Sequence, residues 1–260
     1  METILFSLAQ GIARITLNRP EKLNAFNAAM HAELRGAVLQ ARLGDARVLV
    51  LTGAGRAFSA GQDLGDRTAF AGGSPVDLGA SIDATYNPLV RSLRELPCPV
   101  IAAVNGVAAG AGANVALACD LVIAAQSASF IQAFGKIGLL PDSGGTWMLP
   151  RLVGTARALG LALTGERLSA AQAAAWGLIW RCVEDAELGP TVEELARHLA
   201  AGPTRALAHT KEAMYGSWQR TLSEQLDAER DLQRELGATA DFREGVAAFT
   251  EKRAPRFTGR

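Results

Sequence analysis

The sequence is poor in the residues that cross-link small proteins or hold metal ions. Its 260 residues contain only three cysteines, Cys98, Cys119 and Cys182, which are widely spaced and form no C-x-x-C pair. The three histidines lie at no metal-ligand spacing from a cysteine or from one another. We therefore predict neither a disulfide framework nor a metal site, and we expect a protein of a reducing compartment.

Charge of either sign is not in excess. The chain has 26 Lys and Arg residues against 26 Asp and Glu residues, which gives a formal net charge of zero. A dedicated nucleic-acid binder needs a basic surplus, so we predict no nucleic-acid partner. The sequence also lacks an apolar run of about 18 residues and a basic N-terminal stretch before an apolar one. We expect no membrane association and a cytoplasmic location.

Small and apolar residues are what the sequence does contain. Hydrophobic residues make up 49% of the chain and aromatic residues 6%, beside 27 glycines. Residues 12–18 alternate as a half-buried strand does, and residues 47–51, 100–104 and 121–125 are continuous apolar runs typical of a parallel sheet. Helices are predicted at 27–42, with Asn27 as its N-cap, and at 81–95. This order of elements predicts an α/β fold.

The second half of the chain has a different residue pattern. Alanine-rich helical patterns dominate from about residue 157, and residues 185–190 are a candidate boundary. We predict a core with the active site over 1–190 and a helical region over 191–260 that serves oligomerisation. Residues 58–80 are predicted to form a long loop, which in a compact domain is usually functional or mobile.

The glycine-rich turns do not fit the common nucleotide-binding motifs. Position 58 is Phe58 and position 115 is Val115, so neither Gly53-x-Gly55 nor Gly110-x-Gly112 completes G-x-G-x-x-G. Residues 142–145 (DSGG) resemble the nucleophile stretch of trypsin-like proteases, but the Ala-Ala-His-Cys stretch of that family is missing. We therefore consider a Rossmann site and a protease improbable.

Two interpretations of these turns remain open on the residues alone. Turns of small residues at 60–62 and 110–112 let a ligand carbonyl approach main-chain N–H groups, which are unpaired at a helix start. Two such donors would form an oxyanion hole for an enolate. The alternative is that the glycines only allow a helix to pack closely on a strand.

Four segments in order resemble motifs of the enoyl-CoA hydratase/isomerase (crotonase) superfamily. They are residues 17–25 (LNRPEKLNA), 58–64 (FSAGQDL), 105–112 (NGVAAGAG) and 141–146 (PDSGGT). The resemblance extends over essentially the whole chain. It implies a crotonase-like spiral of repeated ββα units with a C-terminal helical region, and a homotrimer or a dimer of trimers. It also implies that the N–H groups of Gln62 and Ala111 hold a thioester oxygen, with Ala111 standing where many members have glycine.

The same resemblance implies a binding path for coenzyme A, which is part of the substrate, so that no separate cofactor is expected. The substrate-binding residues that it implies are Lys22, Leu23, Asn24, Ala60, Gly61, Asp63, Leu64, Gly110, Asn114, Phe134, Phe249 and Lys252. Phe249 and Lys252 are expected to reach the CoA of a neighbouring subunit. With no net charge on the chain, the CoA phosphates would be met by local basic groups such as Lys22, Arg67 and Lys252.

The acid and base residues indicate the reaction type. Hydratases of this superfamily use two glutamates on one water, and the matching positions here are Asn114 and Phe134. Neither side chain can deprotonate water, which disfavours hydration. Asp142 is the one carboxylate left, and a single base that moves a proton between two carbons describes an isomerase. Taken alone, Asp142 could instead cap the next helix. Asp63 is the second candidate base, with turn stabilisation as its alternative role.

A narrower resemblance concerns the 1,2-epoxyphenylacetyl-CoA isomerases within that superfamily. It rests on residues 60–64, 86–91, 138–147, 176–180 and 249–260. It implies conversion of a ring epoxide to a seven-membered oxepin, with Δ3,Δ2-enoyl-CoA isomerase activity. Phe134, Trp147 and residues 66–90 are expected to shape the acyl pocket. An enoyl-CoA hydratase and a non-catalytic CoA- or RNA-binding scaffold remain the alternative hypotheses.

Overall fold

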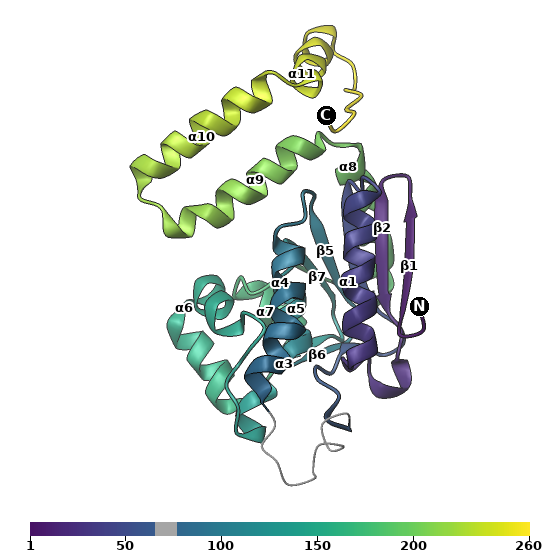
Figure 1. Cartoon of the computed structure of the whole chain (residues 1–260), viewed down its shortest axis with the longest axis vertical. Helices are drawn as coiled ribbons and strands as arrows, with labels where there is room; N and C mark the ends of the chain where they lie inside the picture. Colours follow the sequence, from purple (N-terminus) through teal and green to yellow (C-terminus); the bar gives the residue numbers. More distant parts are fainter. Residues whose placement is uncertain (66–76) are drawn as a thin grey trace.

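The computed structural model describes residues 1–65 and 77–260 and has an α/β architecture (Figure 1). The strands are β1 (Ile4–Ala9), β2 (Ile12–Leu17), β3 (Val48–Gly53), β4 (Ala57–Ser59), β5 (Val100–Val104), β6 (Val107–Ala109), β7 (Leu121–Ala125), β8 (Ser129–Ile131), β9 (Arg167–Ser169) and β10 (Arg181–Val183). The helices are α1 (Ala28–Leu43), α3 (Leu78–Ala84), α4 (Tyr86–Arg94), α5 (Ala111–Leu117), α6 (Gly145–Thr164), α7 (Ala170–Ala175), α8 (Leu188–Ala201), α9 (Thr204–Gly216), α10 (Leu222–Gly237) and α11 (Ala240–Glu251).

The two sheets grow together, because each repeated unit contributes one strand to each of them. The six-stranded sheet has the order β1-β2-β3-β5-β7-β10, and the four-stranded sheet has the order β4-β6-β8-β9. The successive pairs β3–β4, β5–β6 and β7–β8 each give one strand to each sheet, and helices follow each pair. The chain therefore winds as a spiral of ββα units, as the family resemblance implies. The turn from β6 into α5 lies in this spiral.

The core fills both faces of the larger sheet. Residues 48–51 and 100–104 are buried throughout, as expected of parallel strands covered on both sides. Helix α1 contacts β1 and β2, and α8 contacts β3, β5 and β7. The predicted N-cap of α1 is confirmed, because the Asn27 side chain accepts the Met30 N–H at 2.9 Å.

The helix predicted over 81–95 is wrong in one respect, because two helices occupy this stretch. They are α3 and α4, and they meet at Thr85. Pro88 has no N–H, and its ring would clash with the carbonyl of Ala84 in a continuous helix. That carbonyl instead accepts a hydrogen bond from Arg35. The loop predicted over 58–80 also begins and ends with regular structure, in β4 and α3, while residues 66–76 lie outside the described part.

The last three helices extend away from the core (Figure 1). The division predicted at residue 190 falls within helix α8, which packs on the sheet, and the domain boundary remains a prediction. A buried ion pair fastens α9 to the core. Lys211 Nζ lies 2.8 Å from Asp120 Oδ2, with the two side chains 8% and 13% exposed. Tyr215 on the same helix donates to the other Asp120 oxygen at 2.7 Å.

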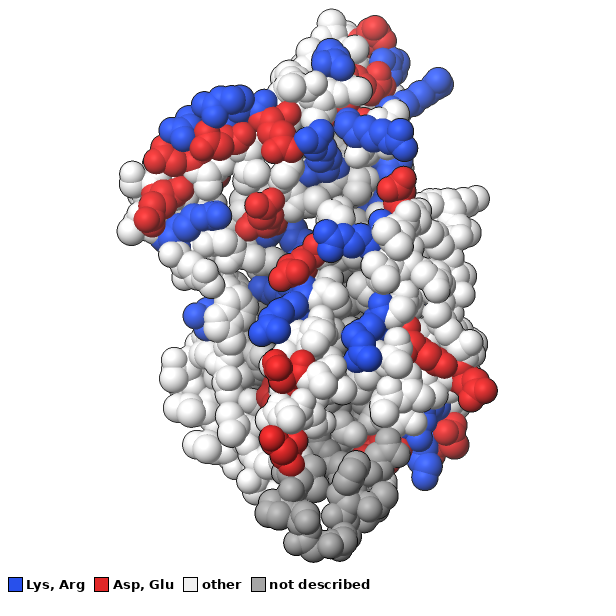
Figure 2. Space-filling model, in the orientation of Figure 1, with Lys and Arg blue, Asp and Glu red and all other residues white. Residues whose placement is uncertain are grey.

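The surface carries both signs of charge without a broad field of either. Figure 2 shows basic and acidic groups interspersed, with the densest mixture over the C-terminal helices. There Arg230 lies between Asp227 and Asp231 on α10. In residues 1–65 and 77–260, no helix combines the length and apolar character that crossing a bilayer requires.

The Asp120–Lys211 pair gives a first prediction. Lys211→Ala leaves the largely buried Asp120 carboxylate without its cation, so we expect the free energy of unfolding to fall by about 3 kcal/mol. Arg234→Ala removes an exposed pair on α10 and should cost less than about 1 kcal/mol. Urea unfolding at one fixed protein concentration measures both. Equal effects of the two substitutions would contradict the role given to the buried pair.

Candidate active site

Two glycine turns from different units of the spiral meet at the start of α5. Gly61 has a φ of +87°, and a Cβ built on it would lie 2.7 Å from the Ala109 carbonyl oxygen and 3.3 Å from the Ala111 nitrogen. A side chain at position 61 would therefore push the two turns apart. The close approach brings the peptide of Gln62 beside the first residue of the helix.

The backbone N–H groups of Gln62 and Ala111 are left without a hydrogen-bond acceptor by the pairing of the described residues. Gln62 forms a parallel bridge with Phe26, in which the Phe26 N–H donates to the Gly61 oxygen and the Asp63 N–H donates to the Phe26 oxygen. Those flanking bonds turn the Gln62 N–H away from Phe26. Ala111 is the first residue of α5, so its N–H has no partner within the helix. Neither N–H donates to a protein acceptor within the described ranges 1–65 and 77–260.

The Gln62 side chain is held in place by Tyr86, a residue that the narrower resemblance includes but for which the sequence gave no contact with Gln62. Tyr86 is 1% exposed, and its hydroxyl donates to Gln62 Oε1 at 2.9 Å. Gln62 Nε2 donates in turn to the Phe26 oxygen at 3.1 Å. The Tyr86 ring packs on His31 with a centroid separation of 4.4 Å. Burial, with the nearby Arg35, lowers the pKa of His31 to about 4, so this imidazole is neutral near pH 7. A buried tyrosine needs a hydrogen-bond partner, and that is the signal that could have identified it.

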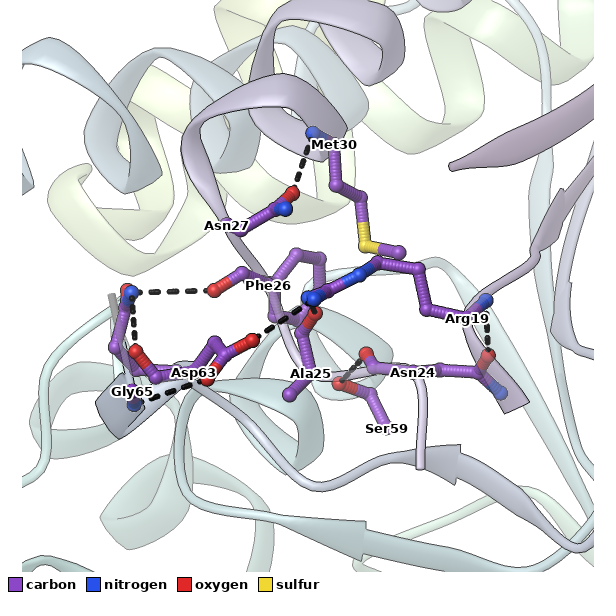
Figure 3. Close-up of polar contacts among 10 residues, drawn as sticks. Arg19, Asn24, Ala25, Phe26, Asn27, Met30, Ser59, Asp63 and Gly65 are labelled. Carbon is purple, nitrogen blue, oxygen red and sulfur yellow. Dashed lines mark hydrogen bonds and ion pairs between the residues drawn. The ribbon is translucent and has the colours of Figure 1, made fainter. Parts of the chain in front are cut away.

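Asp63 is an anchor of this turn (Figure 3). Its carboxylate lies 2.9 Å from Arg19 Nη2, with side chains 14% and 15% exposed, and it accepts the Gly65 N–H at 3.0 Å. Burial alone would raise the pKa of Asp63, but the bonds from Arg19 and Gly65 outweigh it and lower that pKa. Arg19 also donates to the Ala25 oxygen. An ion-paired carboxylate with a lowered pKa is a weak base, so these contacts favour turn stabilisation as the role of Asp63.

Asn24 ties the first segment to the same turn. It is fully buried, its Nδ2 donates to the oxygens of Ala54 and Ala57, and its own carbonyl accepts from Ser59 (Figure 3 shows this last contact). The Asn24 amide is therefore directed toward protein groups. Its neighbour Leu23 is half-buried, with a φ of +50°.

Asp142 stands at the head of a tight turn. Ser143 and Gly144 have φ values of +52° and +82°, and the Gly145 N–H donates to the Asp142 carbonyl oxygen at 2.8 Å, which describes a type I′ turn. Helix α6 begins at Gly145 with Gly144 in the N-cap position, so Asp142 is not the cap of this helix. The Ser143 hydroxyl donates to Asp142 Oδ1 at 2.8 Å and orients the carboxylate.

Asn114 and Phe134, the positions that carry no acid, lie in different surroundings. Asn114 is fully buried, and its Nδ2 donates to the Asp142 carbonyl oxygen at 2.8 Å. Gln132 Nε2 donates to Asn114 Oδ1 at 2.9 Å. The Phe134 ring lies 3.8 Å from where a Cβ of Gly110 would be, so it borders the second glycine turn. Trp147 packs instead against Trp218, with the ring centroids 4.5 Å apart and the ring planes tilted by 58°.

The remaining predicted residues divide between the site and the far end of the chain. Leu64 is exposed and Ala60 is half-buried, and both belong to the first glycine turn or its flank. Lys22 is exposed in another segment, and the carbonyl of the following residue, Leu23, accepts the Ala60 N–H at 2.9 Å. Arg67 lies outside the described residues. Phe249 is 87% exposed at the end of α11, and Lys252 follows it. Figure 1 shows α11 at the opposite end of the molecule from α3, so these two residues do not join the site within one chain.

Known proteins resemble this chain over its full length. Residues 7–260 match the family described as enoyl-CoA hydratase/isomerase. The 1,2-epoxyphenylacetyl-CoA isomerase of Escherichia coli is 56% identical, with 100% of each chain covered. A probable enoyl-CoA hydratase of Rhodobacter capsulatus is 54% identical, with 99% of this chain and 98% of the relative covered. The crystal structure of a putative enoyl-CoA hydratase/isomerase from Mycobacterium abscessus superposes with a TM-score of 0.95 at 36% identity, covering 99% and 100% of the two chains.

The Asp63–Arg19 pair predicts a pH dependence of stability. The folded-state pKa of Asp63 lies below the ordinary value of 3.8, so the pair stabilises the fold above about pH 4 and the stabilisation disappears as the pH falls through the folded-state pKa. We expect Asp63→Asn to lower the free energy of unfolding by roughly 2 kcal/mol at pH 7 and by progressively less below pH 4.

Urea unfolding of both proteins over a pH series measures this difference. Asp83→Asn, at an exposed position of α3, is the matched control and should show little change at any pH. A difference for Asp63→Asn that stayed constant down to pH 2 would contradict the assignment.

Proposed function

Because the chain belongs to the enoyl-CoA hydratase/isomerase family, we propose that it is a CoA-thioester isomerase with Asp142 as its one proton-transferring group. The observation that carries the proposal is the count of acids at the site. The two positions matched to the hydratase glutamates hold Asn114 and Phe134, and neither an amide nor a phenyl ring can take a proton from water. Asp142 remains, oriented by Ser143.

The proposed reaction moves one proton within the substrate. The Asp142 carboxylate removes a proton from the carbon next to the thioester carbonyl, and the electron pair of that C–H bond moves into the carbonyl. The resulting enolate oxygen is held by the N–H groups of Gln62 and Ala111, which are open and close to each other. The protonated Asp142 then returns the proton to a carbon further along the conjugated system. No atom is gained or lost, and this proton shuttle needs no cofactor beyond the CoA of the substrate.

We propose a ring epoxide of phenylacetyl-CoA as the natural substrate. The E. coli relative at 56% identity is named for this activity, and its match covers the entire chain. Removal of the proton beside the thioester is followed by opening of the ring carbon–carbon bond that the epoxide shares. The protonated Asp142 then returns the proton to a ring carbon, which gives the neutral seven-membered oxepin. A linear 3-enoyl-CoA would react through the same enolate, giving the Δ3,Δ2-isomerase activity. The Phe134 ring beside Gly110 offers an apolar wall to either acyl group.

The two alternative functions have less support. A hydratase needs a base for water, and Asp63, the second candidate, is held in an ion pair that lowers its pKa. The Rhodobacter capsulatus relative is named a probable enoyl-CoA hydratase, so this alternative is worth an assay. A non-catalytic scaffold would not require two open N–H groups near each other. A cytoplasmic location remains a prediction from the sequence.

We further propose a homotrimer, or a dimer of trimers, assembled through the C-terminal helices. Large apolar side chains on α10 and α11 are more than half exposed: Leu222, Leu226, Phe242, Val246 and Phe249. An apolar groove between α9, α10 and α11 is lined by Leu236, Phe242 and Phe257. Such surfaces are typical of subunit contacts. Packing α11 on a neighbour would bring Phe249 and Lys252 to that neighbour's CoA, as the family resemblance implies.

The proposed base is tested by Asp142→Asn. We expect isomerisation of a linear 3-enoyl-CoA to fall about 10²- to 10⁴-fold, because the amide cannot accept the proton. Asp185→Asn is the control, since that exposed carboxylate accepts the Ser127 N–H far along the chain from the site. Steady-state kinetics measures the isomerisation, with hydration of crotonyl-CoA followed in parallel. Full isomerase activity of Asp142→Asn, or fast hydration by the wild type, would overturn the proposal.

The proposed assembly is tested by sedimentation velocity. The wild type should sediment at three or six times the chain mass of 27.3 kDa. Phe242→Glu places a charge on the apolar surface and should shift the mass toward that of one chain. Arg243→Glu, the matched change at the next and exposed position, should leave the assembly intact. A monomeric wild type would refute the assembly while leaving the proposed chemistry untouched.

A further inference from the structure

We propose that Asn114 is a positioning residue that holds Asp142 in its reactive orientation, with Gln132 fixing the direction of the Asn114 amide. The inference rests on the proposed role of Asp142 as the base. Asn114 is fully buried and both ends of its amide are used, Nδ2 by the Asp142 carbonyl at 2.8 Å and Oδ1 by Gln132 at 2.9 Å. It therefore acts from behind the site, through the backbone of Asp142.

The direction of the Asn114 amide is set by its partners. The Asp142 carbonyl can only accept, and the Gln132 Nε2 group can only donate. Only one of the two amide orientations satisfies both contacts, and the reverse would place two oxygens together on one side and two NH₂ groups together on the other. Gln132 is 3% exposed, and its Oε1 has no hydrogen-bond partner among the described residues. Gln132 is thus kept in the core at the expense of one unsatisfied acceptor, which fits a role in orienting its neighbour.

The turn at Asp142 needs a stabilising contact from outside the turn, such as the hydrogen bond from Asn114. Ser143 has a φ of +52°, a conformation that non-glycine residues rarely adopt and that persists where the surroundings impose it. The Asp142 carbonyl accepts from the Gly145 N–H within the turn and from Asn114 outside it. Asn114 also fills the space beside the turn, because a Cβ on Gly145 would lie 2.3 Å from Asn114 Nδ2. If the amide contact is lost, Ser143 can relax, and its hydroxyl no longer sets the Asp142 carboxylate.

The same helix carries the oxyanion donor and this hold on the base. Ala111 is the first residue of α5, and Asn114 lies three residues later, so both lie on one face of a buried helix. The position of Asp142 relative to the Ala111 N–H is therefore set by one rigid element. The asparagine at position 114 has a role of its own, because its NH₂ group donates to the Asp142 carbonyl. An ionised glutamate there would face this carbonyl without a proton to donate. The side chain at this position thus favours the one-base reaction.

The test is Asn114→Asp, which keeps the shape of the side chain and removes the NH₂ donor. We expect kcat for a linear 3-enoyl-CoA to fall at least tenfold, while KM and the affinity for acetyl-CoA, a non-isomerising thioester probe, change less than threefold. Thr52→Val is the matched control, because it also removes one side-chain hydrogen bond to a carbonyl, that of Ala103, within the core sheet. It should leave kcat unchanged. An equal kcat for Asn114→Asp and the wild type would overturn the inference.

A double-mutant cycle separates positioning from a general loss of structure. In an Asp142→Asn background, Asn114→Asp should reduce the residual rate less than twofold, because the group on which Asn114 acts is no longer a base. A further tenfold loss in that background would show that Asn114 acts independently of Asp142 and would refute the inference. If Asp142→Asn alone keeps full activity, the proposed function fails first, and the two failures are thereby distinguished.

Gln132→Met provides a second route if Asn114→Asp does not fold. This change removes the orienting donor together with the unsatisfied Oε1 acceptor, so the variant should fold. Without the donor, the Asn114 amide is held at its Nδ2 end alone and is less firmly oriented, so we expect a three- to tenfold loss of kcat with little change in KM. Wild-type kcat in folded Gln132→Met would contradict the orienting role of Gln132.

Discussion

The site depends on how closely other segments approach helix α5. Gly61 presses its turn against Ala109 and Ala111, and Gly112 packs on β4, where a Cβ would lie 2.6 Å from the Ser59 oxygen. Gly145, at the start of α6, has no side chain and so leaves room for the Asn114 side chain of α5. Each approach is possible because a side chain is absent. The short helix therefore fixes two peptide turns and the Asp142 segment relative to one another.

Local patterns in the sequence were enough to predict the longer strands of the large sheet and the N-cap of α1. The strands at 100–104 and 121–125 match the structure to the residue, because continuous apolar runs between turn signals are typical of buried parallel strands. The Asn27 cap was also predictable, because an N-cap is a local contact between residues only three positions apart. The three-residue strands β4, β6 and β8 are too short to show a period, and only the family resemblance implied the repeated units that contain them.

Contacts across the chain could not be predicted in this way. Tyr86 reaches Gln62 over 24 positions, and Asn114 reaches the Asp142 carbonyl over 28. The family resemblance marked Asn114 as a missing acid and as a candidate substrate-binding residue, but no local pattern shows which carbonyl its amide will meet. The break between α3 and α4 is a different case. Pro88 was visible in the sequence, and its effect on the preceding turn is a general one.

A reaction with a single base requires that one carboxylate be placed accurately for both proton transfers, whereas two acids could each serve one of them. One carboxylate that removes a proton and returns it must reach both carbons, so a small rotation affects both steps. The chain meets this demand with neutral groups: a hydroxyl on the carboxylate of Asp142, an amide on its carbonyl, and a phenol that holds Gln62. Neutral hydrogen bonds orient these groups without adding a charge that would compete for the proton. In the proposed reaction, the polar contacts that hold Asp142 and Gln62 therefore supply the positioning that a second acid would otherwise share.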